Sequence, residues 1–187
     1  MILVDVYRLH EAATIPSYGT SLSACFDLSF YPSKTDPMVN GYDKTNVSIQ
    51  RYICDGDLII RPHDRLLIPT GLVFKIHQKF SVENFSDIFA EREELNQFSI
   101  RLHPRSGLAL KRGLVLANSE GIVDIDYQQQ VYILLTNISE VSQTIKVGER
   151  IAQAEIVTNE KVRFVEVTTY PQQYSERDSG FGSTGTM

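Results

Sequence analysis

The chain has 187 residues, of which 42% are hydrophobic, and this suits one globular domain and excludes wholesale disorder. Its formal net charge of −5 argues against broad nucleic-acid binding, which needs a basic face. The charge does not argue against a small anionic substrate held by a few arginines and a divalent cation.

The chain shows no sign of a membrane segment or a leader. No apolar run approaches the roughly 18 residues of a membrane span, and the opening MILVDVYRLHEA has the pattern of a first strand rather than a signal peptide. Cys25 and Cys54 are too few for a disulfide framework and lack metal-ligand spacing. We therefore expect a reduced cytoplasmic location, or the host cytoplasm if the protein is viral.

Strand-forming segments dominate the chain in order. Segments rich in Val, Ile, Leu and aromatic residues occupy 2–9, 57–62, 65–76, 113–118, 130–138, 143–157 and 162–167. Turn residues such as Pro69, Gly71 and Gly148 separate or interrupt them. Many short strands at this spacing predict an all-β sandwich, jelly roll or barrel.

Two stretches have a different pattern. Residues 31–56 are polar, contain Pro and Gly, and indicate a long surface loop. Residues 82–98 place apolar side chains at helical spacing between charges and indicate a short amphipathic helix in an insertion. The simplest interpretation of both is a solvated insertion without chemistry, and a surface for a protein partner is the alternative.

Several short motifs carry candidate chemistry. PRSG (104–107) combines the donor fork of Arg105, the hydroxyl of Ser106 and the open backbone of Gly107, and it precedes a sequence that can open a short helix. An exposed turn explains this motif about as well.

NSEGIVDIDY (118–127) predicts a β-hairpin with Asp124 near its tip. A carboxylate among apolar neighbours is a candidate general base, whereas paired acids at a turn are also ordinary solvated turn residues. ERIAQ (149–153) is unremarkable alone. GFGSTG (180–185) is a Gly-rich tail whose hydroxyls can bind phosphate and whose Phe181 can stack on a base.

The order of the motifs is more specific than any one of them. ACFDL (24–28), PRSGLA (104–109), GIVDIDY (121–127), GERIAQ (148–153) and RDSGFGSTG (177–185) resemble, in sequence, the five motifs of the trimeric dUTP diphosphatase (dUTPase) family. The resemblance runs through nearly the whole chain. It implies a jelly-roll-like β fold of the β-clip type and a homotrimer whose active sites are shared between subunits.

The resemblance also implies a reaction and its biological role. The enzyme would be a hydrolase of nucleotide metabolism that cleaves dUTP to dUMP and pyrophosphate by attack of water on the α-phosphate. The reaction limits uracil incorporation into DNA and supplies dUMP for thymidylate synthesis. Neither nucleic acid nor a membrane is an expected partner.

The implied phosphate site has two parts. The residues assigned to the phosphates are Arg105, Ser106, Gly107 and Gln153, with Arg150 in support. Asp27 helps to hold Mg²⁺, usually through water.

The implied nucleoside site centres on the third motif. The residues assigned to it are Asn118, Gly121, Ile122, Val123 and Tyr132 around uracil, and Tyr127 against the deoxyribose. Asp124 orients and deprotonates the attacking water, whereas Asp126 is expected to be a solvated neighbour. In the tail, Arg177 reaches the γ-phosphate, and Phe181 covers the base with Gly182 and Ser183 beside it.

The chain departs from the family pattern in four places. Cys25 replaces the usual Gly or Ser, Gln128 and Gln129 follow Tyr127 where a basic or polar residue and then Gly are usual, and the spacing from Arg177 to Phe181 is one residue shorter. His103 stands where a small or apolar residue is usual, and we expect a partly exposed structural histidine rather than a phosphate contact. The expected division is one all-β domain over 1–170 and a flexible tail over 171–187.

Two other functions compete with this one. The related dCTP deaminases share the fold and the trimer, but no deaminase pattern occurs around residues 118–135. An inactive or moonlighting binding protein could use 31–56 and 82–98 as partner surfaces, but all the key catalytic side chains are present.

Overall fold

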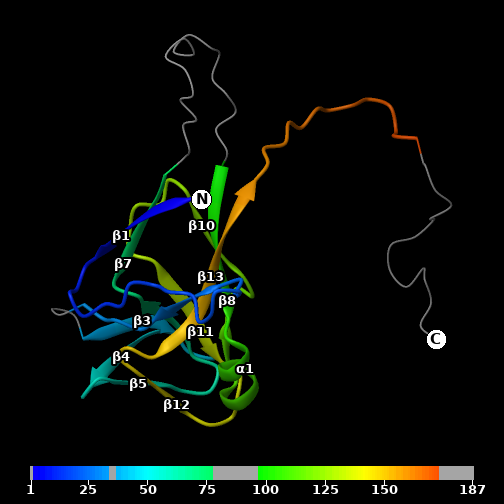
Figure 1. The fold of residues 1–187 in the computed structure, drawn as a ribbon. Coiled ribbons are helices and arrows are strands. Elements are labelled where there is room, and N and C mark those ends of the chain that lie inside the picture. Colours follow the sequence, from blue (N-terminus) through cyan, green and yellow to red (C-terminus); the bar gives the residue numbers. More distant parts are fainter. Residues whose placement is uncertain (1, 34–36, 78–96, 173–187) are drawn as a thin grey trace.

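The computed structural model describes residues 2–33, 37–77 and 97–172, and within them the chain is almost entirely β (Figure 1). A two-stranded sheet pairs β1 (Leu3–Arg8) with β7 (Leu72–His77). A four-stranded sheet has the order β10 (Gly121–Asp124), β8 (Gln97–Pro104), β13 (Arg150–Asn159) and β2 (Phe26–Ser29). A seven-stranded sheet has the order β12 (Gln143–Lys146), β5 (Asp57–Ile60), β4 (Ser48–Cys54), β3 (Met38–Tyr42), β6 (Arg65–Pro69), β11 (Tyr132–Asn137) and β9 (Leu114–Leu116).

The prediction of an all-β fold is therefore confirmed. The one helix in the described ranges is α1 (Ser106–Arg112), and no described helix is long and apolar enough to cross a membrane.

The sheets enclose a single apolar cluster. Alternate residues of β8, namely Phe98, Ile100 and Leu102, are buried in it, and so are Ile133 and Leu135 of β11. This alternation is the period-two pattern of strands with one face on a core. The opposite face of β8 carries Ser99, Arg101 and His103, which are the polar positions of the same strand.

Helix α1 begins directly after β8, as the PRSG motif predicts (Figure 1). Arg105 has an extended backbone and occupies the N-cap position, and its carbonyl accepts hydrogen bonds from the N–H groups of Leu108 and Ala109. Gly113 ends the helix with a φ of 63°, a left-handed conformation that favours glycine. Arg105 therefore lies at a rigid junction between a strand and a helix.

The prediction of a surface loop over residues 31–56 is wrong. Residues 38–42 and 48–54 form the antiparallel pair β3 and β4 inside the seven-stranded sheet. The exposure of β4 alternates along its length, which is typical of a half-buried strand. The intervening turn is held by the Asp43 carboxylate, which accepts hydrogen bonds from the N–H groups of Thr45 and Val47. The polar composition reflects the outer face of this pair and its turn.

The strand expected over 162–167 is also absent, because these residues have no strand pairing. Figure 1 shows the chain leaving the end of β13 and running away from the sheets. The segments 65–76 and 143–157 are each divided into two strands, with Gly71 and Gly148 in left-handed conformations at the breaks. The helix expected over 82–98 lies outside the described residues, except that residues 97–98 begin β8.

Candidate active site

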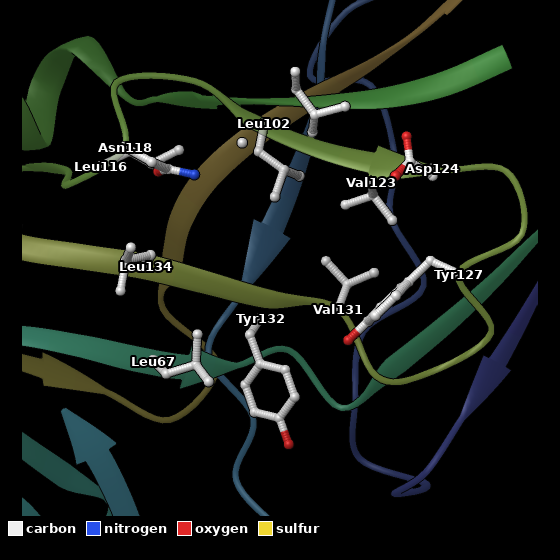
Figure 2. A pocket seen from close by; sticks show the side chains of 12 residues that line it. Leu67, Leu102, Leu116, Asn118, Val123, Asp124, Tyr127, Val131, Tyr132 and Leu134 are labelled. Atoms are coloured by element: carbon white, nitrogen blue, oxygen red, sulfur yellow. The ribbon is translucent and has the colours of Figure 1, made fainter.

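The segment around Asp124 does not form the paired hairpin that its sequence predicts. β10 pairs with β8 in the four-stranded sheet, whereas β11 pairs with β6 and β9 in the seven-stranded sheet. The two strands that flank the turn therefore belong to different sheets. Their separation leaves a gap, and Figure 2 shows that gap as a pocket between β10 and β11.

The gap is a cavity of about 340 Å³, here called the first cavity. Its lining includes all the described residues expected around the uracil and the sugar, together with the expected general base, namely Asn118, Gly121, Ile122, Val123, Asp124, Tyr127 and Tyr132. The remaining lining residues are Leu67, Leu102, Leu116, Val131 and Leu134. Sequence reasoning missed this apolar wall, since its members come from five separate strands or loops and carry no motif.

Asp124 ends β10 at one end of the first cavity, and Asn118 lies at the other end (Figure 2). The backbone carbonyl of Asp124 accepts a hydrogen bond from the N–H of Tyr127 at 3.1 Å, which turns the chain so that the Tyr127 ring also faces the cavity. Within the described residues, the Asp124 carboxylate has no ion-pair or hydrogen-bond partner. It is therefore available to hold a water molecule beside a ligand in the cavity.

A second cavity of about 500 Å³ lies at the other end of the four-stranded sheet and is polar. Its lining consists of Gly19, Ser23, Ala24, Cys25, Asp27, Arg105, Arg150 and Gln153. It brings together the residues expected at the metal and the phosphates, Asp27, Arg105 and Gln153, with Arg150. Ser106 and Gly107 follow Arg105 in α1 but are not among the lining residues.

Asp27 is the centre of the second cavity. Its Oδ1 lies 2.9 Å from Nε of Arg105, and its Oδ2 lies 2.9 Å from Nη1 of Arg150. Gln153 donates from Nε2 to the carbonyl of Pro104 at 3.0 Å, which ties β13 to the end of β8. The carboxylate thus aligns two guanidinium groups on one side of the cavity, and such groups are the preferred partners of phosphate oxygens.

The donors present suit a hydrated ion rather than a closed metal cage. Within the described ranges, no cluster of three or more His, Cys, Asp or Glu side chains could hold a metal. Asp27 is a single carboxylate that already faces two arginines. Mg²⁺ commonly keeps several waters and is bound by one or two carboxylates together with substrate phosphates. The site therefore fits an ion that arrives with a phosphate ligand and meets Asp27 through water.

Cys25 lines the second cavity, and His103 lies opposite Gln153 in the neighbouring strand. Neither residue takes part in the ion pairs of Asp27. Burial, reinforced by the charges of Glu155 and Asp27, raises the pKa of the Cys25 thiol, so this group stays protonated at neutral pH. His103 lies between two carboxylates, with Nε2 at 3.2 Å from Glu155 and Nδ1 at 3.8 Å from Glu120. These contacts agree with the expected structural, partly exposed histidine.

Asp124 of the first cavity and Arg105 of the second lie far apart within one chain. Asp124 pairs with Ser99 at one end of β8, and Arg105 follows the other end of the same strand. Six residue steps of extended chain lead from Ser99 to Arg105, which is roughly 20 Å. The four expected tail residues, Arg177, Phe181, Gly182 and Ser183, lie outside the described residues. The structure thus brings the expected residues together in two groups and not in one.

Comparison with known proteins gives a consistent family. The dUTPase family model matches residues 53–185. The chain is 31% identical over 180 residues to the deoxyuridine 5'-triphosphate nucleotidohydrolase of Hydrogenobaculum sp., with 96% of each protein covered. It is 34% identical over 183 residues to the protein of the same description from Nautilia profundicola, with 97% of this chain and 98% of the relative covered.

Solved structures show the same fold. The dUTPase of Staphylococcus bacteriophage 80alpha with dUPNHPP superposes with a TM-score of 0.69 at 18% identity, covering 98% of this chain and 99% of the phage protein. The dUTPase of Streptococcus mutans superposes with a TM-score of 0.54 at 18% identity, covering 86% and 98%.

Proposed function

This chain belongs to the dUTPase family, and from that premise we propose that it hydrolyses dUTP to dUMP and pyrophosphate by attack of water on the α-phosphate. The observation that carries the proposal is the lining of the first cavity, where the residues that the third motif assigns to the nucleoside meet around one space with Asp124 at its end. The reaction would limit uracil in DNA and supply dUMP.

The nucleoside is recognised by backbone and by apolar walls. Within the described residues β10 pairs only with β8, so its other edge leaves peptide N–H and C=O groups facing the first cavity. These groups match the donor and acceptor edge of uracil. Cytosine presents a donor where uracil presents an acceptor, and each buried polar group left unpaired costs about 1–3 kcal/mol. The Asn118 amide supplies a further polar contact at the inner end.

Asp124 acts as the general base. Its carboxylate is unpaired within the described residues and lies at one end of the first cavity, where we place the α-phosphate of a bound nucleotide. It orients water and takes its proton, and a positioned general base typically accelerates a reaction by ~10²–10⁴-fold. Tyr127, beside it, packs on the deoxyribose and leaves no room for a ribose 2′-hydroxyl.

The triphosphate is held by the second cavity. Arg105 and Arg150 are aligned by Asp27 and offset the charge of the phosphates, while Ser106 and Gly107 add a hydroxyl and backbone donors at the start of α1. Mg²⁺ bound with the substrate would neutralise further phosphate charge, and Asp27 would meet it through water.

A complete site requires more than one subunit. The roughly 20 Å of backbone between the positions of Asp124 and Arg105 in one chain is longer than a triphosphate, so we infer that these two residues of one chain do not act on the same substrate. In a closed ring of identical chains, the first cavity of one subunit can face the second cavity of the next. This geometry supports a homotrimer with shared sites.

The C-terminal segment supports the same assembly. Residues 160–172 leave the sheet with Val162, Phe164, Val165 and Val167 largely exposed. Apolar side chains in such a run are normally covered, and a neighbouring subunit would cover them. The segment would then deliver the tail, so that Arg177 contacts the γ-phosphate and Phe181, with Gly182 and Ser183, covers the base.

The direct test is pyrophosphate release from dUTP with and without Mg²⁺, comparing wild type with Asp124→Asn and Asp126→Asn. Asp124→Asn should reduce kcat by ~10²–10⁴-fold and still bind a non-hydrolysable dUTP analogue, because only the base is lost. Asp126 is the matched control, two residues away and outside the cavity lining, and its variant should keep near wild-type turnover. Near wild-type turnover in Asp124→Asn would remove Asp124 from the mechanism. Deamination of dCTP by the wild-type protein would instead favour the alternative function of a dCTP deaminase.

A further inference from the structure

Gln130 connects the two tyrosines of the first cavity. Its backbone carbonyl accepts a hydrogen bond from the hydroxyl of Tyr127 at 2.9 Å. Its side-chain Nε2 donates to the hydroxyl oxygen of Tyr132 at 2.7 Å. Gln130 itself is half-buried and is not part of the cavity lining. One residue outside the cavity thus holds both of the aromatic side chains that border it.

The same residue is anchored to the sheet. Its Oε1 accepts a hydrogen bond from the N–H of Gly71 at 2.9 Å. The next residue, Val131, accepts from the buried hydroxyl of Thr70 at 2.7 Å and donates its N–H to the carbonyl of Leu72 at 2.9 Å. These bonds tie the end of the loop to the break between β6 and β7, where residues 68–72 are buried. The anchor is therefore rigid.

The neighbouring glutamines make no such contacts. Gln128 and Gln129 are exposed, and in the part of the chain that the structure describes they have no side-chain hydrogen bond. Three consecutive glutamines thus differ sharply in surroundings, and only the third joins the cavity to the sheet. This contrast supplies a matched control within the same loop.

We propose that Gln130 is a positioning residue that fixes Tyr127 and Tyr132 and so sets the selectivity for deoxyribose over ribose, an inference that rests on the proposed function. Tyr127 is 40% exposed, and a ring so open excludes a 2′-hydroxyl only when it is held in place. The Tyr127 hydroxyl is held by the Gln130 carbonyl, and the position of that carbonyl is held by the side chain bonded to Gly71. Gln130 touches no substrate and acts through the tyrosines.

The test is the ratio of kcat/KM for dUTP to kcat/KM for UTP. Gln130→Leu keeps the size of the side chain but removes its hydrogen bonds, and the ratio should fall about tenfold, since one ordinary hydrogen bond corresponds to roughly two- to tenfold. Inhibition by pyrophosphate, which would bind in the second cavity, should not change. Gln129→Leu should leave both the ratio and pyrophosphate inhibition at wild-type values.

Two further variants separate positioning from general damage. Tyr132→Phe removes only the hydrogen bond between Gln130 and Tyr132, so it should lower the dUTP-to-UTP ratio less than Gln130→Leu does. In the double variant the two effects should not add, because both substitutions delete that same bond. Gln130→Glu should restore much of the ratio, since its two oxygens can accept from the Gly71 N–H and the Tyr132 hydroxyl.

An unchanged ratio in Gln130→Leu, or equal losses for dUTP and UTP, would overturn the proposal. If Gln130→Leu does not fold, an unchanged ratio in Tyr132→Phe overturns it.

Failure of the proposed function would look different. Wild-type protein that releases no pyrophosphate from dUTP would overturn the reaction and the selectivity together. The positioning role would then be judged by hydrogen exchange at the Gly71 amide, which should accelerate in Gln130→Leu but not in Gln129→Leu. Equal exchange in the two variants would overturn the positioning role as well.

Discussion

The two aspartates of the proposed site differ in their partners. Asp27 has both carboxylate oxygens at 2.9 Å from guanidinium nitrogens of Arg105 and Arg150. Asp124 has no such partner among the described residues and faces a largely apolar cavity. Asp27 thus aligns two cations, whereas the Asp124 carboxylate can contact water beside the cavity, and this difference in partners supports the separate roles proposed for the two residues.

Tyr127 provides a prediction at this scale. Its ring borders the first cavity beside Asp124, where the sugar of the nucleotide is proposed to lie (Figure 2). Tyr127→Ala should open that position and raise relative turnover of UTP, so the preference for dUTP should fall by at least about tenfold. Tyr127→Phe keeps the ring but loses the hydrogen bond from the Tyr127 hydroxyl to the Gln130 carbonyl, so its preference should lie between those of wild type and Tyr127→Ala. Steady-state kinetics with both nucleotides measures the effect, and undiminished discrimination in Tyr127→Ala would exclude this role.

β10 is the element that creates the first cavity. It is a strand of four residues, Gly121–Asp124, that pairs with β8 on one side and leaves its other edge to the cavity. Gly121 allows it to lie close to β8, because a Cβ at this position would come within 2.8 Å of Cδ1 and 2.9 Å of Cβ of Leu102. The position of Asp124, the proposed general base, thus depends on a close approach between two strands.

Gly121→Val is the corresponding prediction. The added side chain must push β10 away from β8, and overpacking of this kind typically costs about 1–3 kcal/mol in the free energy of unfolding. Turnover of dUTP should also fall under conditions where the variant is still folded, because Asp124 moves with the strand. Gly19→Ala is the control for stability alone, because Gly19 lines the second cavity, and its Cβ would meet only Ser23 Oγ at an ordinary 3.7 Å. Thermal unfolding and kinetics together test this, and wild-type activity in Gly121→Val would contradict it.

At the scale of the whole molecule, the fold places the two halves of the site at opposite ends of β8. Asp124 is aligned with Ser99, and Arg105 lies roughly 20 Å further along. One chain therefore presents the proposed nucleoside cavity in one place and the proposed phosphate cavity in another. A repeated arrangement of chains could bring the two kinds of cavity together, and this supports the proposal of an oligomer.

Subunit complementation tests this arrangement. Asp124→Asn and Arg105→Ala are each expected to be inactive alone. Co-expressed in equal amounts, they should recover roughly a quarter of wild-type activity, because a random ring places an intact Asp124 beside a neighbour's intact Arg105 at one site in four. Asp124→Asn with Asn118→Ala is the control, since both residues line one cavity of one chain and no intact site can form. Absence of recovery in mixed oligomers of verified mass would show that each site lies within one chain.

The sequence by itself determined the fold class, the helix after PRSG and most of the motif residues that line the two cavities, because alternation, turn residues and ordered motifs are local properties of the chain. It misled over 31–56, where polar outer faces of β3 and β4 resemble a loop, and over 162–167, where strand-forming residues have no partner strand within the described chain. The helix over 82–98, the tail residues and the division at residue 170 stay predictions.

The tertiary structure decided what depends on distant partners. It separated β10 from β11 by assigning them to different sheets, and so turned an expected hairpin into a cavity with an apolar wall. It distinguished Asp27, between two arginines, from Asp124, which has no such pair in the described chain. It also singled out Gln130 from its two glutamine neighbours through the bond to Gly71. The physical reason is that local sequence specifies which side chains a strand carries, whereas pairing across sheets specifies what each side chain faces.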